Sequence, residues 1–168
     1  TSSSYVASFV IFGAFLSATG AGQWFIDMAY SLTGKFRSGP AMTAVVSSAA
    51  MGTISGTGVA NVVTTGAFTI PLMKSCGYSS KLAGAVEATA STGGQIMPPI
   101  MGAAAFLMAE YTGVPYSRIA VLAILPAVLY FVGIYIAVHL EAKKLGLKGL
   151  DKDTLPKFNY LVRKLYLL

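Results

Sequence analysis

The sequence predicts an all-α polytopic membrane protein with one re-entrant helical hairpin and one broken helix. The chain is 55% hydrophobic and only 11% charged, with a mean hydropathy of +0.68, whereas soluble domains carry about 25% charged residues. Two glycine-rich polar segments, Gly52–Asn61 and Ala90–Pro99, interrupt the apolar sequence. Non-helical backbone at membrane depth is tolerated only where it is buried in protein or lines a hydrated cavity. The two interruptions are therefore the predicted ion and substrate site of a transporter.

Residues 1–34 are predicted to form the first transmembrane helix. The apolar stretch Tyr5–Tyr30 has the length of an ordinary span, and Trp24 near its end is typical of a membrane interface. A short basic loop with Lys35 and Arg37 follows, and Pro40 is well placed to open the next helix.

Residues 41–73 are predicted to form the re-entrant hairpin. These 33 residues carry almost no charge, and they are too many for one span of about 20 residues. Basic residues lie on both sides, in the loop at 35–37 and at Lys74 and Lys81. A single crossing would place the two basic loops on opposite faces, against the positive-inside tendency. A hairpin with its tip at Ser55–Asn61 keeps them on one face.

Residues 79–110 are predicted to form a broken transmembrane helix. Cys76–Ser79 is expected to be a turn in which Ser79 or Ser80 caps the next helix. The helix is interrupted at Thr92–Gln95, and we expect Pro98–Pro99 to restart it, because proline is tolerated in the first turn of a helix.

Residues 117–141 are predicted to be the last transmembrane helix, after an outer loop at Tyr111–Arg118. Residues 142–168 are predicted to be a cytoplasmic linker and the start of a truncated segment, so the chain is expected to be a fragment of a longer protein. The net charge of +6 comes from basic residues scattered at the ends of apolar segments. This distribution is typical of the cytoplasmic loops of a protein embedded in a lipid bilayer, and it does not favour a nucleic-acid partner.

The two interruptions carry oxygen-rich side chains. The hydroxyl and amide groups of the first and second interruptions belong to Ser55, Thr57, Asn61, Ser91, Thr92 and Gln95, and hard cations prefer such oxygen ligands. Half-helix N-termini at Val59–Val63 and at Pro99 are candidate cradles for a carboxylate. In the alternative interpretation, small residues such as Gly52 and Gly56 only permit close helix packing.

Glu87 is the only acid deep inside an apolar segment. It is either a functional acid of the transport pathway or a buried group hydrogen-bonded to threonine or serine of the hairpin. No catalytic constellation appears, because the sole cysteine, Cys76, and the sole histidine, His139, lie far apart. The chain is therefore predicted not to be an enzyme, to hold no cofactor, and to bind no metal beyond a coupling sodium ion.

Several motifs in order resemble the large membrane subunit of TRAP (tripartite ATP-independent periplasmic) transporters. They are Ser55–Gly66 (SGTGVANVVTTG), Ile70–Lys74 (IPLMK), Gly77–Tyr78 and Ala90–Pro99 (ASTGGQIMPP). The exit Leu140–Gly149 (LEAKKLGLKG) is closest to the fused-permease branch that works with TAXI-type receptors. The resemblance implies half of an inverted-repeat elevator transporter, which imports dicarboxylates or related organic acids with sodium across the inner membrane of a bacterium or archaeon.

The resemblance also implies roles for individual residues. Sodium binding would fall on Ser55, Gly56, Thr57, Asn61, Thr89, Thr92, Gly93 and Gly94. Substrate binding would fall on Gly58, Val59, Gln95, Pro98 and Pro99. The implied partners are a periplasmic substrate-binding protein, a small membrane subunit or its fused equivalent, and the second repeat of the full-length chain. A channel-like pore subunit and a structural membrane subunit are the alternatives.

Overall fold

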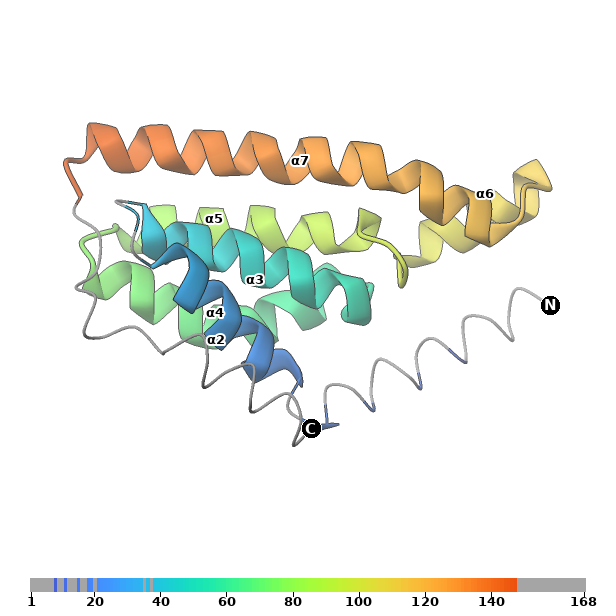
Figure 1. Cartoon of the computed structure of the whole chain (residues 1–168), viewed down its shortest axis with the longest axis horizontal. Coiled ribbons are helices and arrows are strands. Elements are labelled where there is room, and N and C mark those ends of the chain that lie inside the picture. The colour runs from blue at the N-terminus through green and yellow to red at the C-terminus, as the bar shows by residue number, and fades with distance from the viewer. Residues whose placement is uncertain are drawn as a thin grey trace.

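The computed structural model describes residues 21–147 except 35 and 37, and before them only residues 8, 11, 15, 18 and 19. Predictions for Lys35, Arg37 and residues 148–168 lie outside this part, as does the predicted first transmembrane helix apart from Ala21–Thr33 and the five residues before it. Every element of the described residues is helical (Figure 1): α2 (Ala21–Thr33), α3 (Gly39–Ser55), α4 (Gly58–Ser75), α5 (Ser80–Gly93), the short 3-10 helix η1 (Gly94–Ile96), α6 (Ala103–Thr112) and α7 (Tyr116–Lys144).

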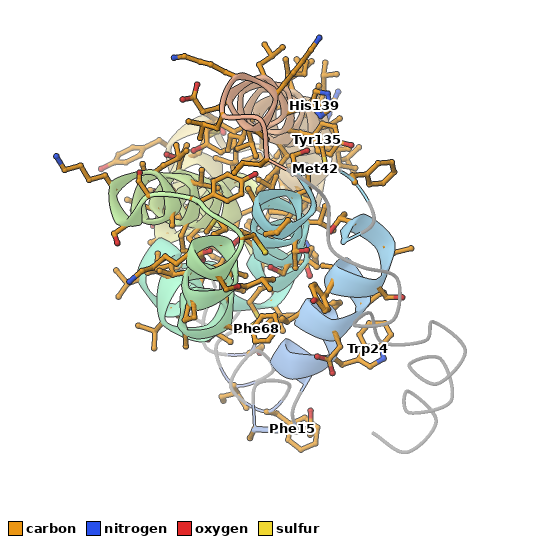
Figure 2. The ribbon with its side chains drawn as sticks, turned by 90° about the vertical axis from the view of Figure 1, so that its left-hand side faces the viewer. Phe15, Trp24, Met42, Phe68, Tyr135 and His139 are labelled. Atoms are coloured by element: carbon orange, nitrogen blue, oxygen red, sulfur yellow. The ribbon has the colours of Figure 1, made fainter. Side chains whose placement is uncertain are left out.

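Helices α3, α4 and α5 all contact one another and form the centre of the described structure. Helix α2 packs on α3, and α7 runs alongside α3 and α5 (Figure 1); Figure 2 shows the same bundle turned by 90°. Small side chains such as Ala41, Ala44, Ala83 and Ala90 fill this core, so the helix axes can approach closely.

The predicted hairpin is observed as two helices, α3 and α4, joined by a two-residue turn. Gly56 ends α3 in the left-handed conformation at φ 61°, which glycine adopts without steric cost. The hydroxyl of Thr57 then accepts a hydrogen bond from the backbone N–H of Ala60 and caps α4. The sequence predicts Asn61 within the turn of the hairpin. This prediction is wrong, because α4 starts at Gly58 and Asn61 lies inside that helix. Entry of the hairpin from one membrane face stays a prediction.

The predicted interruption between α5 and α6 is observed, but the helix does not restart at Pro98–Pro99. After η1, residues 97–102 are non-helical, and α6 begins at Ala103 behind Gly102. A residue that precedes proline is disfavoured in the α conformation, and this restriction applies to Met97 and Pro98 in turn. The loop is closed by a hydrogen bond from the N–H of Gly102 to the carbonyl of Gln95 (2.7 Å).

Helix α7 has 29 residues and is therefore about 43 Å long at 1.5 Å per residue. Among the described residues it is the single helix long and apolar enough to cross a bilayer. Its outer face exposes large apolar side chains, among them Leu122, Leu125 and Leu129. The connection from α6 is only Gly113–Pro115, shorter than the predicted outer loop. At the other end of the structure, Ser79 caps α5 as predicted.

Candidate functional site

The first interruption lies directly against the second at a glycine–glycine contact. A β-carbon built on Gly52 of α3 would lie 2.5 Å from the α-carbon of Gly94 in η1. Real β-carbons do not approach backbone atoms this closely, so glycine is required at this crossing. The contact places the end of the hairpin beside the end of α5 (Figure 1).

The turn of the hairpin also contacts the loop that follows η1. A β-carbon on Gly56 would lie 2.7 Å from the carbonyl oxygen of Ile100, and one on Gly58 would lie 3.1 Å from Nε2 of Gln95. The hairpin turn and the second interruption therefore meet in space at these residues, although they come from two separate segments. Backbone carbonyls, N–H groups and one amide side chain converge there.

Asn61 joins the hairpin to η1 from the inside. Its side chain is fully buried, and Nδ2 donates a hydrogen bond to the carbonyl of Ser48 across the hairpin (2.8 Å). A β-carbon on Gly94 would lie 2.8 Å from the same Nδ2. Asn61 thus positions both arms of the hairpin against the second interruption.

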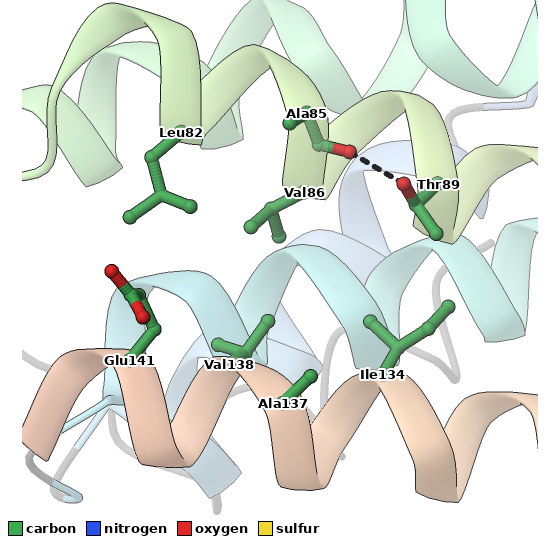
Figure 3. Close-up of a pocket in the computed structure, with 8 residues that line it drawn as sticks. All are labelled: Leu82, Ala85, Val86, Thr89, Ile134, Ala137, Val138 and Glu141. Carbon is green, nitrogen blue, oxygen red and sulfur yellow. Dashed lines mark hydrogen bonds between the residues drawn. The ribbon is translucent and has the colours of Figure 1, made fainter.

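The hydroxyl groups predicted as sodium ligands are not all brought together. Thr57 is exposed and caps α4, and Thr92 is exposed with its hydroxyl bonded to the carbonyl of Ala88 (2.7 Å). Thr89 bonds to the carbonyl of Ala85 in the same way. Its side chain faces an apolar groove between α5 and α7 with a volume of about 310 Å³ (Figure 3). The structure therefore separates Thr89 from the hairpin.

A shallow depression of about 320 Å³ lies at the start of α4 and the end of α5. It is lined by Gly58, Val59, Val62, Val63, Ala88, Thr92 and Gln95. Three of the five predicted substrate-binding residues line it, whereas Pro98 and Pro99 do not. Helix geometry leaves the first N–H groups of α4 without intrahelical acceptors, and the helix dipole adds partial positive charge. The depression thus has a mostly apolar lining and borders a helix N-terminus, which favours negative charge.

Glu87 is fully buried and hydrogen-bonded to the hairpin, as one of its two interpretations predicts. It accepts hydrogen bonds from the hydroxyls of Thr65 and Thr69 on α4, at longer range from Ser48 on α3 (3.4 Å), and from Ser91 one turn along α5 (3.0 Å). We refer to these five residues as the Glu87 cluster. The sequence carried a signal for its α4 members, because Thr65 and Thr69 are spaced by four and share one helix face.

Two tyrosines of α7, which the sequence analysis did not single out, support the second interruption. The hydroxyl of Tyr116 donates to the carbonyl of Pro99 (2.7 Å) and accepts from the N–H of Met101 (3.2 Å). The hydroxyl of Tyr130 donates to the carbonyl of Thr89 (2.8 Å). The ring of Tyr116 stacks on Phe106 of α6 with centroids 4.4 Å apart. Helix α7 thereby holds both sides of the interruption.

Comparison with known proteins finds similarity along the chain. Residues 1–167 match the family described as "Tripartite ATP-independent periplasmic transporter, DctM component". The chain is 28% identical over 146 residues to a protein of Haemophilus influenzae described as a TRAP transporter large permease, with 87% of the chain and 34% of that protein covered.

Two further relatives carry more specific names. The C4-dicarboxylate TRAP transporter large permease protein DctM of Pseudomonas aeruginosa is 24% identical over 156 residues (93% of the chain and 36% of that protein). The isethionate TRAP transporter permease protein DctMQ of Oleidesulfovibrio alaskensis is 26% identical over 145 residues (86% and 22%). The chain thus spans about a third or less of the length of these relatives.

Proposed function

The chain belongs to the family of DctM components of tripartite ATP-independent periplasmic transporters, and from this premise we propose that it carries half of a sodium-coupled site for organic acids. Membership makes the chain part of a membrane-embedded permease and not an enzyme. The observation that carries the proposal is the convergence of the hairpin turn on the second interruption through Gly52 and Gly94.

Sodium binding is proposed at this convergence. The ligands would come from the backbone and side-chain oxygens of Ser55, Gly56, Thr57, Asn61, Thr92, Gly93 and Gly94. The α3 helix ends here, and its last carbonyl groups carry partial negative charge that favours a cation. Thr89 is left out of the proposed set, because it lines the groove between α5 and α7 on the side away from the hairpin turn.

The organic acid is proposed to bind in the depression beside it. The N-terminus of α4 supplies unpaired N–H groups at Gly58 and Val59, and Gln95 supplies an amide donor. The two relatives with named substrates are described as transporters of C4-dicarboxylates and of isethionate. Both are small organic anions, and the helix N-terminus beside the depression would favour their negative charge.

The remaining parts of the transporter are proposed from the family. The depression is open on one side and would be completed by a second, inverted repeat of the full-length protein. A periplasmic binding protein would deliver the substrate, and a small membrane subunit or fused equivalent would accompany this multi-pass inner-membrane permease. The Leu140–Gly149 exit supports assignment to the fused branch that works with TAXI-type receptors.

Uptake by the full-length parent protein tests the proposal. Proteoliposomes with the parent and its binding protein should accumulate labelled succinate when an inward sodium gradient is applied. Thr92→Ala should reduce uptake, because Thr92 lines the depression. Thr64→Ala is the matched control, since the Thr64 hydroxyl also bonds to a carbonyl four residues earlier, away from the depression. If the rate of carboxylate uptake is the same with and without the sodium gradient, the proposed sodium coupling is wrong.

A further inference from the structure

Gly93 and Gly94, at the junction of α5 and η1, lie between two helices that leave no room for a side chain. A β-carbon on Gly94 would lie 3.1 Å from the α-carbon of Gly52 in α3. A β-carbon on Gly93 would lie 2.5 Å from Cε1 of Tyr130 in α7. Both glycines have a negative φ, at −60° and −59°, which any residue can adopt. Glycine is therefore required here by space, and the junction is confined from two sides.

Tyr130 is held in this contact by its hydroxyl. The hydroxyl donates a hydrogen bond to the carbonyl of Thr89 (2.8 Å), one turn of α5 before Gly93. The ring also meets Phe131 edge to face, with centroids 5.6 Å apart. Because the ring touches Gly93 and the hydroxyl bonds to the same helix, the ring cannot leave the junction without breaking this bond. Phenylalanine would fill the same space but would lack the bond to α5.

Tyr116 makes the corresponding contact beyond the interruption. It lies fourteen residues before Tyr130 on α7, which is nearly four helical turns and about 21 Å. The two tyrosines therefore share one face of α7, and this helix runs alongside α5 (Figure 1). Tyr130 bonds to the chain before the interruption, whereas Tyr116 bonds to Pro99 and Met101 after it. One helix face thus spans the whole interruption.

The segment between these two contacts carries Gln95, which lines the depression proposed for the organic acid, whereas neither tyrosine lines it. The carbonyl of Gln95 accepts a hydrogen bond from the N–H of Gly102 (2.7 Å). Its Nε2 would lie 3.1 Å from a β-carbon on Gly58, at the hairpin turn. A shift of the segment along α7 would therefore move the Gln95 amide relative to the hairpin.

We propose that Tyr130 and Tyr116 are positioning residues for the proposed sodium and organic-acid site. Their hydroxyls hold residues 93–95 at the distance from the hairpin turn that binding requires, although neither tyrosine touches a ligand. Aromatic rings pack equally well without hydroxyls, so a role in packing alone would leave the affinity of a phenylalanine variant unchanged. The identity of the ligands rests on the proposed function.

Uptake by the full-length parent protein measures the affinity of the site in phenylalanine variants. Proteoliposomes receive labelled succinate with the binding protein, and the concentrations of sodium and of succinate are varied in turn. Tyr130→Phe and Tyr116→Phe should each raise the half-maximal concentrations by about threefold to tenfold, the effect of one lost hydrogen bond. The maximal rate should stay near that of wild type, because no ligand contact is removed.

Tyr135→Phe is the matched control for both variants. Tyr135 lies on the same helix, beside Val45 and Ala49 of α3, and among the described residues no hydrogen bond joins its hydroxyl to the second interruption. Its removal should leave the half-maximal concentrations unchanged.

Hydrogen exchange in the purified full-length protein tests the contact without transport. In Tyr116→Phe the N–H of Met101 loses its acceptor, so this amide should exchange at least about threefold faster than in wild type. Tyr135→Phe should leave the exchange of Met101 unchanged. Equal exchange in wild type and Tyr116→Phe would overturn the positioning role, whatever the substrate.

The outcomes separate this role from the proposed function. If both variants keep the half-maximal concentrations of Tyr135→Phe, the positioning role is wrong, even when wild-type uptake depends on sodium. A lower maximal rate with unchanged half-maximal concentrations would also overturn it, because the tyrosines would then serve packing alone. If wild-type uptake is the same with and without sodium, sodium coupling fails, and a raised half-maximal succinate concentration in both variants still supports the positioning role.

Discussion

The α-carbon of Gly94 occupies the place that a side chain on Gly52 would need, because a β-carbon there would lie only 2.5 Å away. The contact joins α3 to η1 backbone against backbone. Neither partner can move a flexible side chain aside, so the proposed ion site depends on both glycines.

Gly52→Ala should therefore impair uptake by the full-length parent and lower its stability. Overpacking a tight contact costs about 1–3 kcal/mol, and the hairpin would be pushed away from η1. Gly84→Ala is the control, since Gly84 lies in α5 with nothing within 4 Å of its added β-carbon. That change should stabilise the helix by about 0.5–1 kcal/mol. Equal uptake by both variants would show that the contact is not needed.

Gly56→Ala should cost more stability than Gly113→Ala. Both glycines end a helix with positive φ, at 61° and 68°, and alanine in this conformation costs about 1–2 kcal/mol. Only Gly56 also faces a backbone carbonyl, that of Ile100, which its β-carbon would approach to 2.7 Å; at Gly113 nothing lies within 4 Å. Thermal denaturation in detergent measures the difference. Equal losses of stability would mean that only the positive φ of each glycine matters, and that the contact between Gly56 and the carbonyl of Ile100 contributes nothing.

Single-cysteine labelling should test the proposed topology. In a Cys76→Ala background, Phe36→Cys and Ser79→Cys should both resist an impermeant thiol reagent added outside, because a re-entrant hairpin returns to the face on which it began. Thr112→Cys should react, since it lies at the end of α6, on the proposed outer side. All three positions are exposed. Labelling of Phe36→Cys or Ser79→Cys alone would show that the α3–α4 segment crosses the membrane.

Tyr78 should make stability depend on pH in alkaline solution. Burial, with a smaller contribution from the nearby Cys76 thiolate, raises the pKa of Tyr78 from 10 to about 12. The neutral phenol is therefore favoured in the folded protein. Its contribution is complete below pH 10 and is lost as the pH rises towards 12. Tyr78→Phe should remove this part of the alkaline loss, as followed by thermal denaturation between pH 8 and 11.5.

The same variant should be tolerated at neutral pH. The hydroxyl of Tyr78 is a buried polar group without a hydrogen-bond partner among the described residues, and removing such a group is neutral or slightly stabilising. Tyr111→Phe is the control, because Tyr111 is 87% exposed. A steeper alkaline loss in Tyr78→Phe than in wild type would contradict the expected sign.

The helical hairpin, the interruption of α5 and the long last helix could all be predicted from the sequence, because each has a local cause. Chain length and loop charge indicated the hairpin, and the glycines at 93 and 94 indicated the interruption. The start of α6 differs from the prediction, because two consecutive prolines indicate a helix start by composition alone. Their effect on Met97 and Pro98, the residues before each ring, delays the helix to Ala103.

The contacts between segments could not be predicted in the same way. Nothing local pairs Gly52 with Gly94 or Tyr116 with Pro99, because these contacts depend on how the helices pack. The partners of Glu87 were anticipated only as hairpin hydroxyls, since the sequence does not show which face of α4 meets α5. Thr89 is separated from the hairpin because its side chain lies on the face of α5 that packs against α7, and the sequence does not show which face this is.

The hydroxyl of Tyr116 bonds to both Pro99 and Met101, seventeen and fifteen residues earlier in the chain. The shape of this loop is thus encoded partly outside it, at the first residue of α7. A chimaera that exchanges residues 90–102 between two permeases would transfer the glycines and prolines of this loop. It would not transfer the Tyr116 hydroxyl, which holds the loop by its hydrogen bonds to Pro99 and Met101. A segment exchanged to change specificity at this interruption should therefore extend to Tyr116.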